Sequence, residues 1–282
     1  MSRPRRPVIA LTTDFGLHDN YVGVLHGVIL AINRAAVVVD LCHAVPPQDV
    51  DAGAFLLGAA YRYFPSDTIH LAVVDPGVGS HRPAIALATP GGTFVGPDNG
   101  LFSVAIREQS PGLPAQGGAV SAALLGPRLS VVRLTNPAYF LPRVSATFHG
   151  RDVFAPVAAH LASGVPIDRL GEPPETVYLL PAARPVRRPD GTLVAHIVHS
   201  DQFGNLTTDL SAAQAEQLPQ PLVFRLHGRI VRGLNRYYAE GPELMALIGS
   251  SDRVEIAVRN GSAALTLGAR VGDEIEVLPA QQ

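Results

Sequence analysis

The first hundred residues alternate between short apolar runs, typical of buried strands, and longer segments with apolar residues at helical spacing. This β-α-β-α-β order needs crossover connections, so it predicts a mainly parallel, Rossmann-like sheet sandwiched by helices. Ligands of such sheets bind beyond the carboxyl ends of the strands. The expected strands are 7–15, 35–42 and 68–75, the expected helices are 21–33 and 49–64, and a hairpin closed by Gly91 and Gly92 follows.

The pattern changes after another expected helix at 150–164. Residues 172–191 are rich in proline and poorly periodic, which favours an interdomain linker. From about Leu193 only short strand patterns follow, typical of a small antiparallel barrel or sandwich. We therefore expect an N-terminal α/β domain over 1–172, a linker over 173–191 and a C-terminal all-β, barrel-like domain over 192–282.

Composition excludes several classes of protein. Hydrophobic residues make up 47% of the chain and charged residues 16%, which predicts a well-buried core. A net charge of −2 leaves no basic excess to neutralise phosphates, so nucleic acid is not an expected partner. Neither a signal peptide nor an apolar run of roughly 20 residues, as a membrane helix needs, is found. The single cysteine, Cys42, fits a reducing compartment, and we expect a soluble cytoplasmic protein without a membrane partner.

Three aspartates fall at or just after the ends of expected strands: Asp14, Asp75 and Asp98. Because the carboxyl ends of parallel strands meet at one edge, their carboxylates are expected along one rim. Asp14, in TTDFG, can accept hydrogen bonds from a ribose diol, although a helix cap or a loop carboxylate fits the same pattern. In VVDPGVGSHR, turn chemistry explains the proline and the glycines but not Asp75 and Arg82.

The segment 145–156 is the densest polar cluster of an otherwise apolar chain. Asp152 stands near the start of a helix, where the helix dipole favours a carboxylate, and capping with an ion pair to Arg151 is the favoured interpretation. His149 lies between Phe148 and Gly150, where its ring can project into a cleft. A structural histidine fits that position equally well.

Two loops of the second expected domain also carry polar side chains. In SDQFGNLTTDL, Phe203 can stack on a flat ring and Asn205 can read polar edges, or the segment is a turn organised by Asx chemistry. Ser250 and Ser251 precede a strand and can bind a carboxylate, whereas Asn260 and the glycine after it are a turn signal.

Together these stretches resemble the S-adenosylmethionine (SAM) hydrolases, or SAM hydroxide adenosyltransferases, which are relatives of fluorinase and chlorinase. The resemblance covers nearly the whole chain, through TTDFG, NYVGVLHGVI, VVDPGVGSHR, FVGPDNGLFS, TFHGRDVFAP, SDQFGNLTTD and EIAVRNGSAA. It implies an N-terminal α/β domain and a C-terminal β-domain. It also implies a homotrimer, with the small-molecule substrate bound between the N-terminal domain of one subunit and the C-terminal domain of its neighbour.

The resemblance implies water attack at ribose C5′ of SAM, giving adenosine and L-methionine, with no metal and no cofactor. The water-using members carry an Asp-Arg-His triad that maps onto Asp75, Arg82 and His149, whereas halide-using members have a non-acidic residue in place of Asp75. An arginine beside Asp75 is expected to keep that carboxylate ionised and to lower its basicity, which makes His149 a credible partner base.

The resemblance also assigns the substrate contacts. Fluorinase uses a serine-arginine pair for the methionine carboxylate, and the pair that corresponds here is Ser250-Ser251. The implied binding residues are Asp14 for the ribose diol, Asn205 and Phe203 near the adenine, Asp201, Ser250 and Glu255 for the methionine end, and Val258.

Three other functions fit parts of the sequence. A divalent metal can use carboxylates and imidazole, although no compact pair such as His-x-Asp or His-x-x-x-His occurs. A halogenase can use the same fold, but an anion avoids a carboxylate such as Asp75. A non-catalytic sensor of adenosine or SAM is the third. The ligands of the metal alternative are Asp14, Asp75, Asp98, His149 and Asp152.

Overall fold

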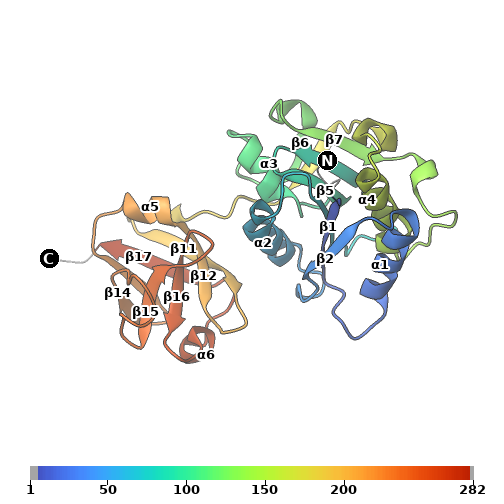
Figure 1. Cartoon of the computed structure of the whole chain (residues 1–282). Coiled ribbons are helices and arrows are strands. Elements are labelled where there is room, and N and C mark those ends of the chain that lie inside the picture. The colour runs from blue at the N-terminus through green and yellow to red at the C-terminus, as the bar shows by residue number, and fades with distance from the viewer. Residues whose placement is uncertain (1–5, 280–282) are drawn as a thin grey trace, which may run out of the picture. The chain divides into compact units, whose positions relative to one another are not determined.

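The computed structural model describes residues 6–279, and the chain divides into two compact units between Ala182 and Ala183 (Figure 1). Each unit has its own hydrophobic core. The segment 173–191, expected as a linker, holds two short strands. β9 (Thr176–Leu179) pairs with β6 (Gly118–Ser121) of the first unit, and β10 (Val186–Arg187) pairs with β11 (Leu193–Ser200) of the second.

The first unit is built on a seven-stranded sheet in the order β2-β1-β3-β5-β4-β7-β8. β1 pairs in parallel with β2 and β3, and β3 with β5, whereas β4, β7 and β8 are added antiparallel. The mainly parallel sheet and the β4–β5 hairpin confirm the sequence prediction. The strands are β1 (Val8–Thr13), β2 (Val37–Cys42), β3 (Ile69–Val73), β4 (Ala84–Thr89), β5 (Gly92–Pro97), β7 (Ser130–Leu134) and β8 (Gly171–Glu172).

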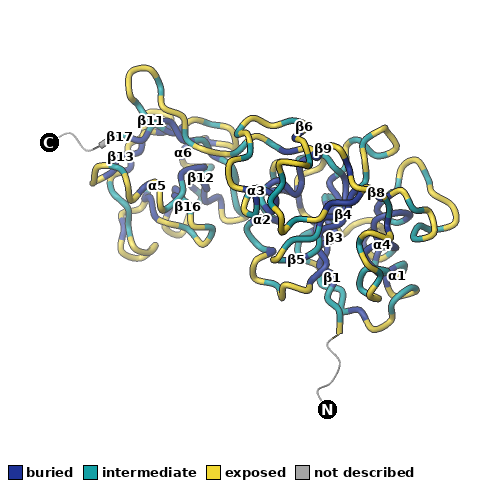
Figure 2. Tube along the Cα trace, turned by 90° about the horizontal axis from the view of Figure 1, so that it is seen from above, coloured by how far each residue is buried: buried dark blue, intermediate teal, exposed yellow. Residues whose placement is uncertain are grey.

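Helices cover both faces of this sheet (Figure 1), and buried residues follow its central strands (Figure 2). Successive side chains of a strand point to opposite faces. Leu71 and Val73 of β3 therefore join the core beneath α1 and α4, while Ala72 and Val74 join the core beneath α2 and α3. The helices are α1 (Tyr21–Ile32), α2 (Val50–Ala60), α3 (Ser103–Gln109) and α4 (Ala155–Ala162).

Local signals set the helix ends. The Asp49 side chain accepts a hydrogen bond from Ala52 N–H at 2.8 Å and caps α2, as the sequence predicts. The expected helix 150–164 begins instead with a turn of π-helix, Gly150–Phe154, which continues into α4. The short helical turns are Tyr61–Tyr63, Ala122–Leu124, Pro137–Tyr139 and Ile167–Leu170. No helix within residues 6–279 is long and apolar enough to cross a membrane.

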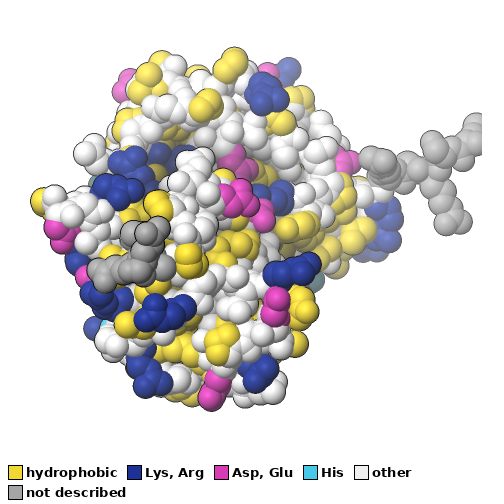
Figure 3. All heavy atoms as spheres, turned by 90° about the vertical axis from the view of Figure 1, so that its left-hand side faces the viewer, with side chains coloured by type: hydrophobic (Ala, Val, Ile, Leu, Met, Phe, Trp, Pro, Cys, Tyr) yellow, Lys and Arg dark blue, Asp and Glu magenta, His cyan; other side chains and the backbone are white. Residues whose placement is uncertain are grey.

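The second unit is an antiparallel, nearly closed barrel, as its short strand patterns predict. Its strand order is β14-β13-β17-β11-β12-β16-β15, and the two end strands contact each other. Besides β11, its strands are β12 (Leu206–Ser211), β13 (Leu222–Leu226), β14 (Arg229–Arg232), β15 (Leu244–Ile248), β16 (Arg253–Val258) and β17 (Glu274–Pro279), and its short helices are α5 (Ala212–Glu216) and α6 (Ala263–Leu267). The face drawn in Figure 3 mixes basic, acidic and apolar side chains.

His70 of β3 is a buried polar group that the core does not satisfy. It is 1% exposed, and neither ring nitrogen has a hydrogen-bond partner among the described residues. Its ring stacks on Phe94 at 5.1 Å and meets Tyr61 and Phe64 edge-on. Burial disfavours the charged imidazolium and lowers the pKa of His70 to about 4.

We predict that His70 makes the protein acid-sensitive. Because its folded-state pKa lies below the unfolded value, its contribution is intact above about pH 6.5 and is lost as the pH falls toward 4. The loss amounts to about 2 kcal/mol between pH 8 and pH 5. Denaturant unfolding at both pH values should show a loss that is about 2 kcal/mol larger in the wild type than in His70→Leu, whose packing cost is the same at both pH values. The lowered pKa values of His160 and His199 contribute equally to both proteins. The exposed His18, changed to Ala, is the control. Equal pH dependence of wild type and His70→Leu would contradict the prediction.

Candidate active site

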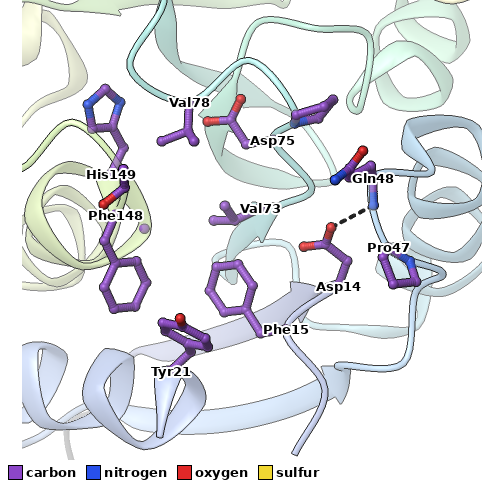
Figure 4. A pocket seen from close by; sticks show the side chains of 13 residues that line it. Asp14, Phe15, Tyr21, Pro47, Gln48, Val73, Asp75, Val78, Phe148 and His149 are labelled. Carbon is purple, nitrogen blue, oxygen red and sulfur yellow. Dashed lines mark hydrogen bonds between the residues drawn. The ribbon is translucent and has the colours of Figure 1, made fainter. Parts of the chain in front are cut away.

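The candidate site lies where β1 and β3 end. These strands are parallel neighbours with Thr13 opposite Val73, so Asp14 and Asp75 leave the sheet at the same edge. Both line a cavity of about 390 Å³ (Figure 4). The other lining residues come from the end of β3, four loops, the start of α1 and the start of the π-helical turn: Phe15, Tyr21, Pro47, Gln48, Val73, Pro76, Val78, Thr147, Phe148, His149 and Gly150.

Asp75 and Arg82 form a buried ion pair. The loop after β3 turns through Pro76 and Gly77 and returns Arg82 to the strand end, so that Arg82 Nη2 donates to Asp75 Oδ2 at 2.5 Å. The two side chains are 5% and 10% exposed. Arg82 Nη1 also donates to the Pro83 carbonyl at 2.6 Å, which fixes the guanidinium behind the carboxylate. The ion pair explains why an aspartate and an arginine both occur in this turn.

Arg82 lowers the pKa of Asp75, as expected, but burial adds a larger effect that the sequence did not predict. Burial raises the pKa of Asp75 by more than Arg82 and His149 lower it, so its pKa lies above the ordinary value. Its Oδ1 is buried and has no hydrogen-bond partner among the described residues. A backbone interaction with Gly77 also lowers the pKa of this carboxyl group, but burial outweighs it as well.

His149 reaches the cavity from another part of the chain. It precedes the π-helical turn Gly150–Phe154 and lines the cavity on the side across from Asp14 (Figure 4). Turns of π-helix occur frequently at functional sites. The loop that carries His149 packs tightly on the loop after β3: Gly79 has φ +77°, and a Cβ built on it would stand 2.3 Å from the Ala146 carbonyl oxygen.

Asp14 is held by its neighbour across the sheet edge. Its Oδ2 accepts from the backbone N–H of Gln48 at 2.8 Å. Gln48 adopts the left-handed conformation, with φ 65°, which is uncommon for a non-glycine residue and occurs often at functional sites.

Two acidic residues of the metal alternative take other roles. Asp152 is fully buried and accepts from Arg151 at 2.6 and 3.0 Å and from Ser145 N–H at 2.8 Å, which matches the structural interpretation. Asp98 directly follows β5, which is parallel to β3, so it leaves the sheet at the same edge as Asp14 and Asp75, as expected. Its carboxylate accepts from Tyr178 N–H at 2.8 Å and does not line the cavity. Within residues 6–279 no group of three His, Cys, Asp or Glu side chains is placed to hold a metal ion.

One side of the cavity is lined by aromatic rings, which the sequence analysis did not predict. Phe15, Tyr21 and Phe148 meet pairwise with ring centroids 5.1–5.8 Å apart, and they gather on the side of the cavity away from Gln48 (Figure 4). Phe15 and Phe148 stand directly beside Asp14 and His149 in the sequence, so adjacency to a polar site residue was the available signal.

In the second unit, Asp201 organises a turn. Its Oδ1 accepts from the N–H groups of Phe203 and Asn205 at 2.9 Å, and its Oδ2 accepts from Asn205 Nδ2 at 2.9 Å. This is the Asx turn that the sequence left open. Asn205 is 8% exposed, whereas Phe203 is 76% exposed and presents its ring to the surface.

Glu255 is the other notable carboxylate of this unit. It lies on β16, is 8% exposed, and accepts from the hydroxyl of Tyr238 at 2.7 Å, a partner that sequence reasoning missed. Burial raises the pKa of Glu255, and the nearby Asp201 adds to the rise. Ser250 lies exposed in the turn before β16, and Val258 is buried at its end.

The fold and the site define a class of two-domain protein: an α/β unit with an acidic pocket at its strand ends, followed by an antiparallel barrel. The chain belongs to the SAM hydroxide adenosyltransferase family, whose N-terminal domain matches residues 9–171 and whose C-terminal domain matches residues 195–276.

Two hydrolases match nearly the whole chain, and a fluorinase matches a smaller part of it. The (R)-S-adenosyl-L-methionine hydrolase of Salinispora tropica is 40% identical over 96% of this chain and 97% of its own. The protein of that name from Thermus thermophilus is 41% identical over 97% of this chain and 100% of its own. A fluorinase of Nocardia brasiliensis is 25% identical over 76% of this chain and 74% of its own.

A solved structure supports the fold. It is titled an uncharacterized conserved protein from Thermotoga maritima and matches with a TM-score of 0.82 and 32% identity, covering 95% of this chain and 99% of that one.

We predict that Gly79→Ala separates the two loops that carry Asp75 and His149. The new methyl group would meet the Ala146 carbonyl well inside contact distance, so one loop must move. SAM turnover should fall about 100-fold, since displacements near 1 Å cost this much, while circular dichroism shows a folded protein. Gly112→Ala is the matched control, because Gly112 also has positive φ but open space around it. Equal turnover in the two variants would contradict the prediction.

Proposed function

We propose that this protein hydrolyses SAM by water attack at ribose C5′, releasing adenosine and L-methionine. The relatives are named for the (R) epimer of the sulfonium, and we extend that substrate to this chain. The observation that carries the proposal is the state of Asp75. It is a buried carboxylate at the cavity wall, clamped by Arg82 on one oxygen and unpaired on the other.

The chemistry needs a base but no acid. As water attacks C5′, the C5′–S bond breaks and its electron pair stays on sulfur, so the leaving group is a neutral thioether. The attacking water must lose a proton, and we assign its acceptance to Asp75, whose Oδ1 has no hydrogen-bond partner among the described residues. The raised pKa of Asp75 makes it a better base than an exposed aspartate. His149, on the neighbouring loop, can orient the water or take the proton onward.

Arg82 bonds the Asp75 carboxylate but does not itself line the cavity. A buried carboxylate without a cation would take up a proton and lose its basicity. The ion pair opposes this effect of burial and fixes Oδ2, so Oδ1 would be the oxygen that takes the proton. The guanidinium also lies 5.6 Å from the centre of the Phe154 ring. Replacing it by lysine would lose that planar contact.

The substrate contacts follow from the family resemblance. Asp14 would hold the ribose diol, and its bond to Gln48 N–H leaves Oδ1 available for a hydroxyl. A neighbouring subunit of a cytoplasmic homotrimer would supply the adenine contacts and the methionine contacts. Glu255 is the carboxylate best suited to the methionine ammonium, because it is buried and its one recorded bond is from a neutral hydroxyl. The residues of the second unit that would make these substrate contacts are Asp201, Phe203, Asn205, Ser250, Glu255 and Val258.

We predict the products and their isotope content. Purified protein incubated with SAM in ¹⁸O-labelled water should give adenosine labelled at its 5′ oxygen, together with unlabelled methionine. Chloride, fluoride and a chelator should leave the rate within about twofold, because the proposed step uses only water and side chains. A 5′-halogenated product would indicate a halogenase, loss of activity with chelator a metal enzyme, and tight binding without turnover a sensor. Each of these outcomes would overturn the proposal.

A further inference from the structure

A chain of hydrogen bonds runs from the surface of the first unit to the base of the TTDFG loop. His43, in the loop after β2, is 5% exposed and uses both ring nitrogens. Its Nε2 lies 3.0 Å from Asp40 Oδ1, and its Nδ1 lies 2.8 Å from Thr13 Oγ1. Asp40 Oδ1 also lies 2.7 Å from His26 Nε2, on α1. The proposed reaction uses none of these four residues.

The direction of each bond follows from the acceptor at one end. Burial tends to raise the pKa of Asp40, but its bonds to His43 and His26 outweigh burial and hold it below the ordinary value, so the carboxylate is ionised and only accepts. His43 Nε2 must therefore carry a hydrogen. In the neutral ring Nδ1 is then an acceptor, and the Thr13 hydroxyl donates to it.

This arrangement fixes the Thr13 hydroxyl, which in turn holds the loop. Thr13 Oγ1, with its own hydrogen directed at His43, accepts the N–H of Phe15 at 3.2 Å. The backbone carbonyl of His43 accepts the N–H of Gly16 at 2.8 Å. The loop is thus tied to His43 on both sides of Asp14 and Phe15. Thr13 is fully buried and cannot itself meet a ligand.

We propose that Thr13, whose buried hydroxyl His43 orients, is a positioning residue that holds Asp14 and Phe15 in the orientation that binds the nucleoside part of the substrate. The inference rests on the proposed function for its ligand, since Asp14 is assigned there to the ribose diol. The order Asp40–His43–Thr13 resembles a catalytic triad in its bonding, but the buried hydroxyl makes it a support for the site.

The test compares Thr13→Val, which keeps the shape and removes the hydroxyl, with Thr13→Ser, which keeps the hydroxyl. In the full-length protein, Thr13→Val should raise the KM for SAM and the Kd for adenosine about tenfold, the effect of one lost buried hydrogen bond, with kcat changed less than about twofold. Thr13→Ser should restore both constants to within about threefold of the wild type. His26→Gln, which alters only the outermost bond, is the control and should leave both constants unchanged.

A second readout does not depend on the substrate. Hydrogen exchange of the Phe15 and Gly16 amides should be faster in Thr13→Val than in the wild type and Thr13→Ser. Unchanged exchange, or equal KM values in the Val and Ser variants of an active enzyme, would overturn the positioning role. If the wild type fails to hydrolyse SAM, the proposed function is wrong, but the exchange comparison still tests whether the Thr13 hydroxyl holds the loop. In that case, adenosine binding that Thr13→Val leaves unchanged would overturn the positioning role.

Discussion

A carboxylate buried at the end of a strand requires a cation beside it, and this requirement organises the pocket. The ion pair of Asp75 and Arg82 meets it within one short loop. To return Arg82 to the strand end, the chain must reverse direction, which explains the proline and the glycines between the two residues. The reversal brings Gly79 against the Ala146 carbonyl, and so couples the ion pair to the loop of His149. The pairing of the buried Asp75 carboxylate with a cation therefore constrains the backbone of the loop after β3 and of the loop that carries His149.

The parallel pairing of β1 and β3 provides the second constraint. It delivers Asp14 and Asp75 to the same edge from segments sixty residues apart in the chain, as strand ends in open α/β sheets generally do. The remaining supports of Asp14 come from the loop after β2, the third strand of this group: Gln48 bonds its carboxylate and His43 bonds its flanking backbone. The two carboxylates thus differ in their environment. Asp75 is paired with a cation and buried, while Asp14 is held by a backbone amide, and this difference suits one to chemistry and the other to binding.

The sequence predicts the mainly parallel sheet and the common edge of Asp14 and Asp75, because hydrophobic periodicity indicates which segments are buried strands and where they end. It does not predict that Asp98 turns away to Tyr178, since the direction of a side chain just past a strand depends on the loop. It predicts that Arg82 lowers the pKa of Asp75, but it does not predict that burial raises this pKa by more. An arginine is visible in the sequence, whereas the opposing desolvation depends on burial in the folded state. The Asp201 turn was an open alternative, and the hydrogen bonds of that residue identify it.

The central claim is that Asp75 and Arg82 act as one unit on the attacking water. A double-mutant cycle measures this most directly, with kcat/KM for SAM determined in the wild type, Asp75→Asn, Arg82→Met and the double variant. The account predicts that Arg82→Met lowers kcat/KM about 100-fold when Asp75 is present and by less than about threefold in the Asp75→Asn background. Losses of equal size in the two backgrounds would show that the residues act independently and would contradict the account.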